Sequence, residues 1–104
     1  MRKVQLVLSD LAVADILEQA DWYIAKAGHP LAKRWEKAVT STIFRILRNP
    51  SSGRLCLFRA RILRDVRSMS IDGFPKHLLF YRFRRSEVFV LRVVHGAREL
   101  EGLF

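Results

Sequence analysis

The sequence predicts an α+β domain in the order β-α-α-β-β-β, with a helical hairpin packed on a mostly antiparallel sheet. Apolar residues in the first half recur at the three- and four-residue spacing of helices. The second half is rich in β-branched and aromatic residues separated by short turn signals. Because 104 residues suffice for about one domain, we expect a single domain over residues 1–104.

The first half predicts one strand and two helices. Residues 4–8 form a β-compatible run, and Ser9 then offers a side-chain oxygen that caps a helix. Gly28 is well placed to end this helix, and Asn49-Pro50 stops the next one. Two amphipathic helices joined by so few residues are expected to pack as an antiparallel hairpin. The predicted inner face of the first helix comprises Val13, Ile16, Leu17, Ala20, Ile24 and Ala27.

The second half predicts three further strands. Residues 51–60 form a polar and basic connection that leads into them. Asp72-Gly73 is a strong two-residue turn signal, and Pro75 is expected to delay the hydrogen bonding of the following strand. Arg85-Ser86 forms the last tight turn. The strands are expected within 61–71, at 77–84 and at 87–94.

Positive charge is concentrated in the second part of the chain. Residues 1–44 carry six Lys or Arg against five Asp or Glu, whereas residues 45–104 carry thirteen against five. All thirteen except Lys76 are arginine, which is preferred where a planar group must meet carboxylate or phosphate. Such a field suits nucleic acid, an acidic protein partner, or both in turn. A merely soluble basic surface is the alternative.

Several classes of protein are disfavoured by the sequence. No apolar run approaches the roughly 20 residues that span a bilayer, and residues 1–6 lack a secretory signal. Cys56 is the only cysteine, which fits a reducing cytoplasm. The three histidines are too scattered to propose a metal site, and no motif for a cofactor is present. We therefore expect a cytoplasmic protein without membrane contact, metal or cofactor.

The C-terminal run is the most informative part of the chain. An apolar strand leads into the polar segment 95–99, His-Gly-Ala-Arg-Glu, and the chain ends on Leu-Phe. A strand with polar groups at its end holds them in a fixed place, as binding and catalytic sites require. The alternative is a last core strand with a frayed tail.

Several short motifs keep one register along nearly the whole chain. They include Leu8-Ser9, Ala14-Asp15-Ile16, Tyr23-Ile24, Asn49-Pro50 through Gly53-Arg54, Val66-Arg67-Ser68, Gly73 to Arg82, and Leu91 to Glu99. The chain thereby resembles the ParE branch of the RelE/ParE superfamily of bacterial toxins. The resemblance implies a toxin that traps DNA gyrase on cleaved DNA, with only indirect DNA association. It also implies an acidic, ParD-like antitoxin with a ribbon-helix-helix start as partner.

RelE-like members of the superfamily instead cut messenger RNA on the ribosome. The resemblance places their catalytic positions at Met69, Ile71, Leu78, Arg98 and Phe104. Of these only Arg98 can neutralise a phosphate, and none of the others exchanges protons. We therefore expect a protein that is not an enzyme. A ribosome-dependent endoribonuclease and a non-toxic binding member stay open as alternatives.

The candidate contact residues are all in the basic half. Arg98 is the first choice, with a salt bridge to a neighbouring glutamate as the alternative. His95 either donates to a partner or caps its strand, whereas Arg67 and Arg82 either contact an antitoxin carboxylate or are solvated. Phe104 belongs to an apolar tail that either covers the domain or contacts a partner. Trp22, Tyr23 and Trp35 are expected to pack in the core.

Overall fold

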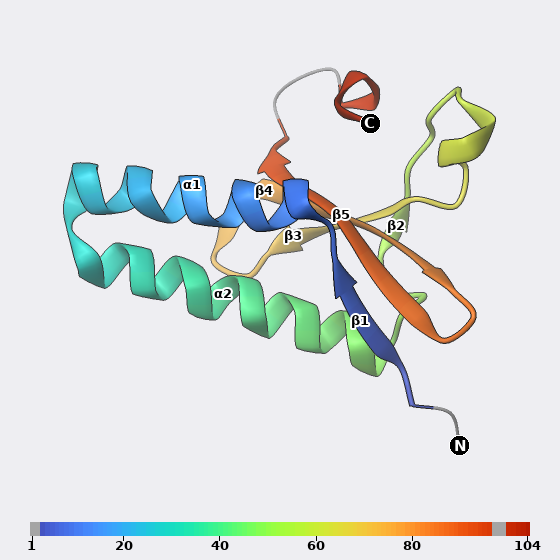
Figure 1. Ribbon diagram of the computed structural model, residues 1–104, viewed down its shortest axis with the longest axis horizontal. Coiled ribbons are helices and arrows are strands. Elements are labelled where there is room, and N and C mark those ends of the chain that lie inside the picture. Colours follow the sequence, from blue (N-terminus) through green and yellow to red (C-terminus); the bar gives the residue numbers. More distant parts are fainter. Residues whose placement is uncertain (1–2, 97–99) are drawn as a thin grey trace.

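The computed structural model describes residues 3–96 and 100–104, and its helices and strands form two layers (Figure 1). Two short 3-10 turns, η1 (Arg61–Leu63) and η2 (Glu101–Leu103), accompany them. The remaining elements are β1 (Gln5–Leu8), α1 (Asp10–Ala27), α2 (His29–Arg48), β2 (Arg54–Leu55), β3 (Arg67–Ile71), β4 (Phe74–Arg84) and β5 (Glu87–His95).

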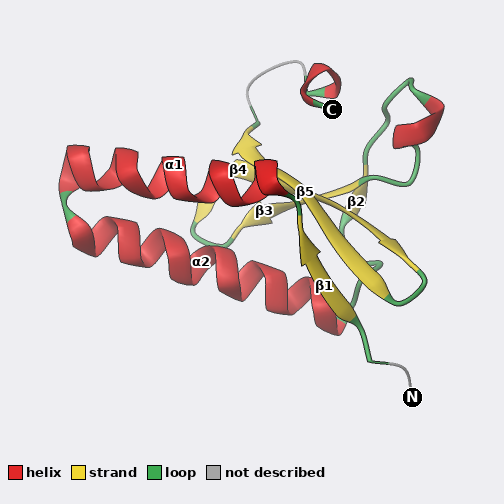
Figure 2. Cartoon of the chain, viewed as in Figure 1, coloured by secondary structure: helices red, strands yellow, loops and turns green. Residues whose placement is uncertain are grey.

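The sheet has the strand order β1-β5-β4-β3-β2 (Figure 2). β1 runs parallel to β5, with Gln5 opposite Glu87 and Leu8 opposite Val90. All other neighbours are antiparallel. The predicted α+β class with a mostly antiparallel sheet is therefore confirmed. The two-residue β2 was not predicted, because it lies inside the connection expected over residues 51–60.

The helices begin and end where their capping residues indicate. The Ser9 hydroxyl accepts a hydrogen bond from the Ala12 amide at 3.0 Å. Gly28 adopts φ +89° between the two helices, a conformation that glycine tolerates. The Nε1 of Trp35 on α2 donates to the carbonyl of Ile16 on α1 at 3.1 Å and ties the hairpin together. In the described part of the chain, neither helix is long and apolar enough to cross a membrane.

The hairpin turns follow the prediction, but β4 starts earlier than expected. Arg85 and Ser86 both have positive φ, as a type I′ hairpin turn requires. β4 begins at Phe74 rather than at residue 77, so Pro75 lies inside the strand. The register against β3 jumps from Leu78 to Phe74, and Pro75 pairs with neither neighbour. Its missing N–H therefore removes no hydrogen bond from the sheet.

The main core lies between the helices and one face of the sheet. Trp35, Tyr81, Val88 and Val90 are completely buried there. The prediction for α1 was wrong in part, because its most deeply buried residues are Ala12 and Ala20. Leu17 and Trp22, both expected inside, are 56% and 54% exposed. α1 is apolar on more than one side, so spacing alone does not identify the side that faces the sheet.

A second, smaller core covers the opposite face of the sheet. Phe80 on β4 is fully buried there, together with Leu63 and Val66 from the segment that joins β2 to β3. Leu100 from the C-terminal segment packs against the same cluster. The loop and the chain terminus therefore take the place of a helical layer on this face.

Candidate functional site

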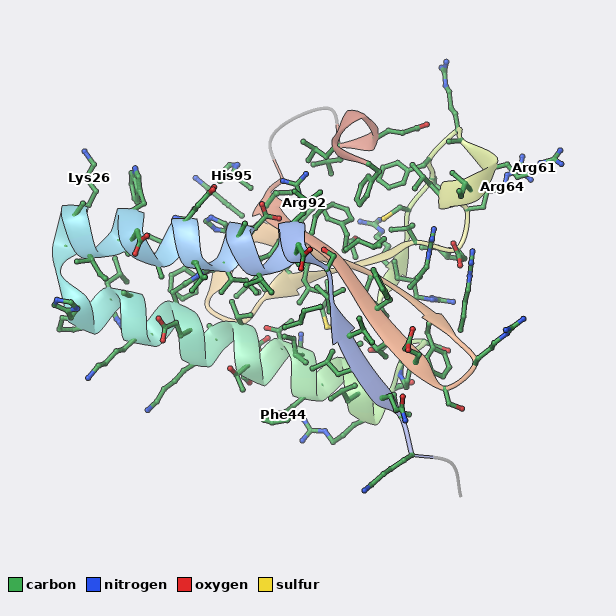
Figure 3. All side chains as sticks on the ribbon, in the orientation of Figure 1. Lys26, Phe44, Arg61, Arg64, Arg92 and His95 are labelled. Carbon is green, nitrogen blue, oxygen red and sulfur yellow. The ribbon has the colours of Figure 1, made fainter. Side chains whose placement is uncertain are left out.

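Of the two candidate residues in the polar C-terminal segment, only His95 lies within the described residues. Arg98, the first choice from the sequence, lies outside the described residues. His95 is exposed at the end of β5, directly opposite His77 on β4, and the two ring centroids are 5.4 Å apart. Figure 3 shows His95 beside the middle of α1. No hydrogen bond of the His95 ring is present among the described residues.

Arg67 is committed to contacts within the chain. Its Nη1 donates to the carbonyl of Ser51 at 3.1 Å and to that of Gly53 at 2.8 Å. The amide of Gly53 in turn donates to the hydroxyl of Tyr81 at 2.9 Å, and this hydroxyl donates to the carbonyl of Pro50 at 2.7 Å. Arg67 and Tyr81 together fasten the turn after α2 to the sheet. A contact of Arg67 with an antitoxin stays a prediction.

Arg82 is likewise engaged within the chain. Its Nη2 lies 3.0 Å from a carboxylate oxygen of Asp65 and donates to the carbonyl of Ile62 at 2.6 Å. Arg84 binds the other oxygen of the same carboxylate at 2.6 Å. Burial raises the pKa of Asp65, but the hydrogen bond from Arg84 and the charges of both arginines outweigh it and lower the pKa overall. The partner contact predicted for Arg82 also stays a prediction.

Phe104 lies over the second core. Its ring centroid is 5.6 Å from that of Phe58 and 5.5 Å from that of Phe80. The carboxylate of Glu101 accepts hydrogen bonds from the amides of Arg59 and Ala60 at 2.8 and 2.9 Å. Phe104 thus helps to cover the domain while it stays 40% exposed, and the C-terminal segment and the β2–β3 loop support each other.

Arg92 has a structural role that the sequence did not reveal. Its guanidinium donates to both carboxylate oxygens of Asp15 and to the carbonyl of Leu103. The hydrogen bonds that Arg92 donates to Asp15 raise the pKa of Arg92 further. The only signal in the sequence was an acid on α1 and a base on the last strand, 77 residues apart. Nothing local to either residue indicates that they meet.

A groove of about 600 Å³ lies between α1 and the ends of β4 and β5. Trp22 and Tyr23 line it together with His77, His95 and the acidic side chain of Glu18. Burial, and secondarily the charge of His95, lowers the pKa of His77. The groove is therefore lined by aromatic rings and by side chains that can form hydrogen bonds, and it has no local excess of positive charge.

The outer face of α2 offers a second hollow, of about 670 Å³. Phe44 lies there with its side chain 56% exposed, on the outer side of α2 (Figure 3). Lys33, Lys37 and Arg48 line the same hollow, against a single acid, Glu36. We call these four residues, Lys33, Lys37, Phe44 and Arg48, the α2 face. An exposed aromatic ring within a polar, charged surround resembles the apolar core and polar rim of a protein interface.

The fold and these surfaces can be compared with known proteins. A family model described as "ParE toxin of type II toxin-antitoxin system, parDE" matches residues 6–100. The chain belongs to the ParE toxin family. Its resemblance to the ParE branch is thus confirmed, and the protein is a ParE toxin of a type II toxin–antitoxin system.

A solved structure is similar to this ParE toxin in fold. It is described as "Chromosomal ParDE TA system from P. aeruginosa" and is 18% identical, with a TM-score of 0.74. The similarity covers 89% of the present chain and 96% of the other. No curated protein matches the sequence. At this identity the likeness establishes the fold, and the function of individual residues has to come from their own chemistry.

Metal-ligating side chains and the one thiol can be located in the described part of this ParE toxin. Residues 3–96 and 100–104 contain no group of three or more His, Cys, Asp or Glu arranged to hold a metal ion. Burial raises the pKa of the Cys56 thiol, although a hydrogen bond with Ser68 opposes this. A raised pKa disfavours the thiolate, which is the nucleophilic form.

Proposed function

We propose that this ParE toxin acts by binding, that its target is DNA gyrase, and that it does not cleave RNA. The observation that carries the proposal concerns the positions that RelE-like nucleases use. Ile71 is 1% exposed in the main core, and Met69 packs against that core. Leu78 packs against the second core, and the ring of Phe104 meets that of Phe80 edge to face. Apolar groups in these places cannot activate a ribose hydroxyl or stabilise a developing negative charge.

We further propose that an acidic antitoxin segment neutralises the toxin by binding along the α2 face. The net charge of +9 attracts such a segment, and the α2 face supplies cations around an exposed aromatic ring. A disordered acidic chain can fold as a helix on this surface and bury Phe44. Association with DNA is then indirect, through gyrase or through the antitoxin, and the toxin acts in the cytoplasm.

A supercoiling assay with purified gyrase tests the target. Toxin in excess should leave relaxed plasmid relaxed, and protease treatment should release linear DNA from trapped cleavage complexes. Full supercoiling without trapped DNA would exclude gyrase as the target.

The two alternatives have their own readouts. Cleavage of messenger RNA on purified ribosomes, lost in Arg98→Ala, would establish the nuclease instead. Normal growth of a bacterial host that produces the toxin without antitoxin would indicate a non-toxic binding member.

A further inference from the structure

The loop between β2 and β3 exposes two large aliphatic side chains. Leu57 is 97% exposed and Ile62 is 71% exposed, the two highest values among the large hydrophobic residues described. Burial of such a side chain is favourable, and the folded toxin forgoes most of that stabilisation at both positions. Single exposed apolar residues are common, but two nearly uncovered ones on a short loop point to an interaction surface.

The exposure of these side chains is built into a well-anchored loop. The amide of Cys56 donates to the carbonyl of Val66 at 2.9 Å and closes the base of the loop. Glu101 accepts two backbone hydrogen bonds from the loop, and Arg82 donates to the carbonyl of Ile62. The neighbours of the exposed pair, Phe58 and Leu63, point inward to the second core. Leu57 and Ile62 are therefore presented outward in a preorganised way, which lowers the entropy cost of binding.

The same loop, taken together with the two residues of β2, is strongly basic. Residues 54–64 contain four arginines and no acid: Arg54, Arg59, Arg61 and Arg64. Among the described residues none of the four forms a salt bridge within the chain. Arg61 and Arg64 lie at the outer edge of the loop, which extends away from the sheet (Figure 3). The surface thus combines exposed aliphatic side chains with four arginines that form no salt bridge among the described residues.

We propose that residues 54–64, which comprise β2 and most of the loop after it, are the surface by which the toxin docks on a folded target protein, in an apolar pocket rimmed by acidic residues. The arginines supply the charge complementarity, and Leu57 and Ile62 supply the apolar anchors of the interface. Nucleic acid is a poorer match, since its backbone offers nothing apolar to these tips. A disordered antitoxin segment fits the hollow of the α2 face better than it fits this loop. Because the loop protrudes, it requires a partner with a concave surface.

The inference rests on the proposed function, because it takes the toxin to act by contact with a target protein. Its test compares Leu57→Ser/Ile62→Ser with the wild-type toxin in a host without antitoxin and in the gyrase supercoiling assay. Both side chains are exposed, so the double variant should keep its circular dichroism spectrum and thermal midpoint. We expect growth arrest to be lost, and the toxin concentration for half-maximal gyrase inhibition to rise about tenfold or more. Affinity for the antitoxin should change less than about threefold.

Matched variants separate this surface from the others. Leu17→Ser removes an exposed leucine from α1 and should leave growth arrest intact. Arg61→Glu/Arg64→Glu should weaken growth arrest as Leu57→Ser/Ile62→Ser does. Lys33→Glu/Lys37→Glu makes the same change of charge on the α2 face and should leave growth arrest intact. Glu101→Gln, which weakens the support of the loop, should give a smaller loss.

Several outcomes would overturn the inference. Undiminished growth arrest by the folded Leu57→Ser/Ile62→Ser variant would do so, and so would a loss of antitoxin affinity in that variant. A loss of toxicity that follows the arginines alone would indicate phosphate binding instead. If the wild-type toxin arrests growth without inhibiting gyrase, gyrase is not the target. The effect of Leu57→Ser/Ile62→Ser on growth arrest then tests the docking surface by itself. A wild-type chain that arrests no growth would overturn both.

Discussion

Asp15 on α1 and Arg92 on β5 form a two-point ion pair, with Oδ2–Nε and Oδ1–Nη2 distances of 2.8 and 2.9 Å. The same carboxylate accepts the amide of Val93 at 3.0 Å, and Arg92 also donates to the carbonyl of Leu103 at 3.1 Å. The two side chains are only 11% and 17% exposed. One ion pair thus connects the first helix, the last strand and the C-terminal segment.

Asp15→Asn should destabilise the fold by about 3 kcal/mol, because it leaves a largely buried guanidinium without its charged partner. Denaturant unfolding followed by circular dichroism measures the loss. The double variant Asp15→Leu/Arg92→Met leaves neither charge unpaired and should regain most of the stability. A single variant within about 0.5 kcal/mol of wild type would show that solvent satisfies Arg92.

Gly53→Ala should be strongly destabilising. A Cβ atom at this position would lie 2.4 Å from the Tyr81 hydroxyl, which is held by hydrogen bonds on both sides. Tyr81→Phe removes those bonds without a clash and should cost about 1–3 kcal/mol. Gly102→Ala is the matched control, since nothing lies within 4 Å of its added Cβ. Equal thermal midpoints for both alanine variants would contradict this close contact.

The stability of the toxin should fall as the pH is lowered below the ordinary histidine pKa of about 6.5. His77 has a lowered pKa in the folded state, so in this range the unfolded chain binds a proton that the folded chain does not. The stability present above about pH 6.5 is lost as the pH falls through the folded-state pKa. Unfolding measured on both sides of this range tests the prediction. His77→Phe should flatten the dependence, and His95→Gln should reduce it; an unchanged profile in His77→Phe would refute the assignment.

The features predicted correctly from the sequence are those with local signals. Ser9, Gly28 and the turn at Asp72-Gly73 act through their own backbone preferences, so they mark the ends of elements wherever they occur. Family membership rests on motifs spread along most of the chain, and it too could be read from the sequence.

The contacts between distant residues could not be predicted in this way. Arg92 and Arg82 looked like any other arginine in a basic chain, but each is fixed by a carboxylate far away in the sequence. In the β2–β3 loop the sequence alternates basic and apolar residues without indicating that Phe58 faces inward and Leu57 outward. That difference depends on the opposite face of the sheet and on the C-terminal segment, which no local pattern describes.

Lys33→Glu/Lys37→Glu should weaken antitoxin binding about tenfold or more if the acidic segment lies along the α2 face. The loss should shrink at high salt, because exposed charges are screened, whereas the loss caused by Phe44→Ser should persist. Isothermal titration with the purified antitoxin at two salt concentrations separates these contributions. Arg61→Glu/Arg64→Glu makes the same change of net charge on the β2–β3 loop and serves as the control. Equal losses in both charge-reversal variants would mean that the antitoxin responds to the overall field of the toxin, and the α2 face would then lose its assignment.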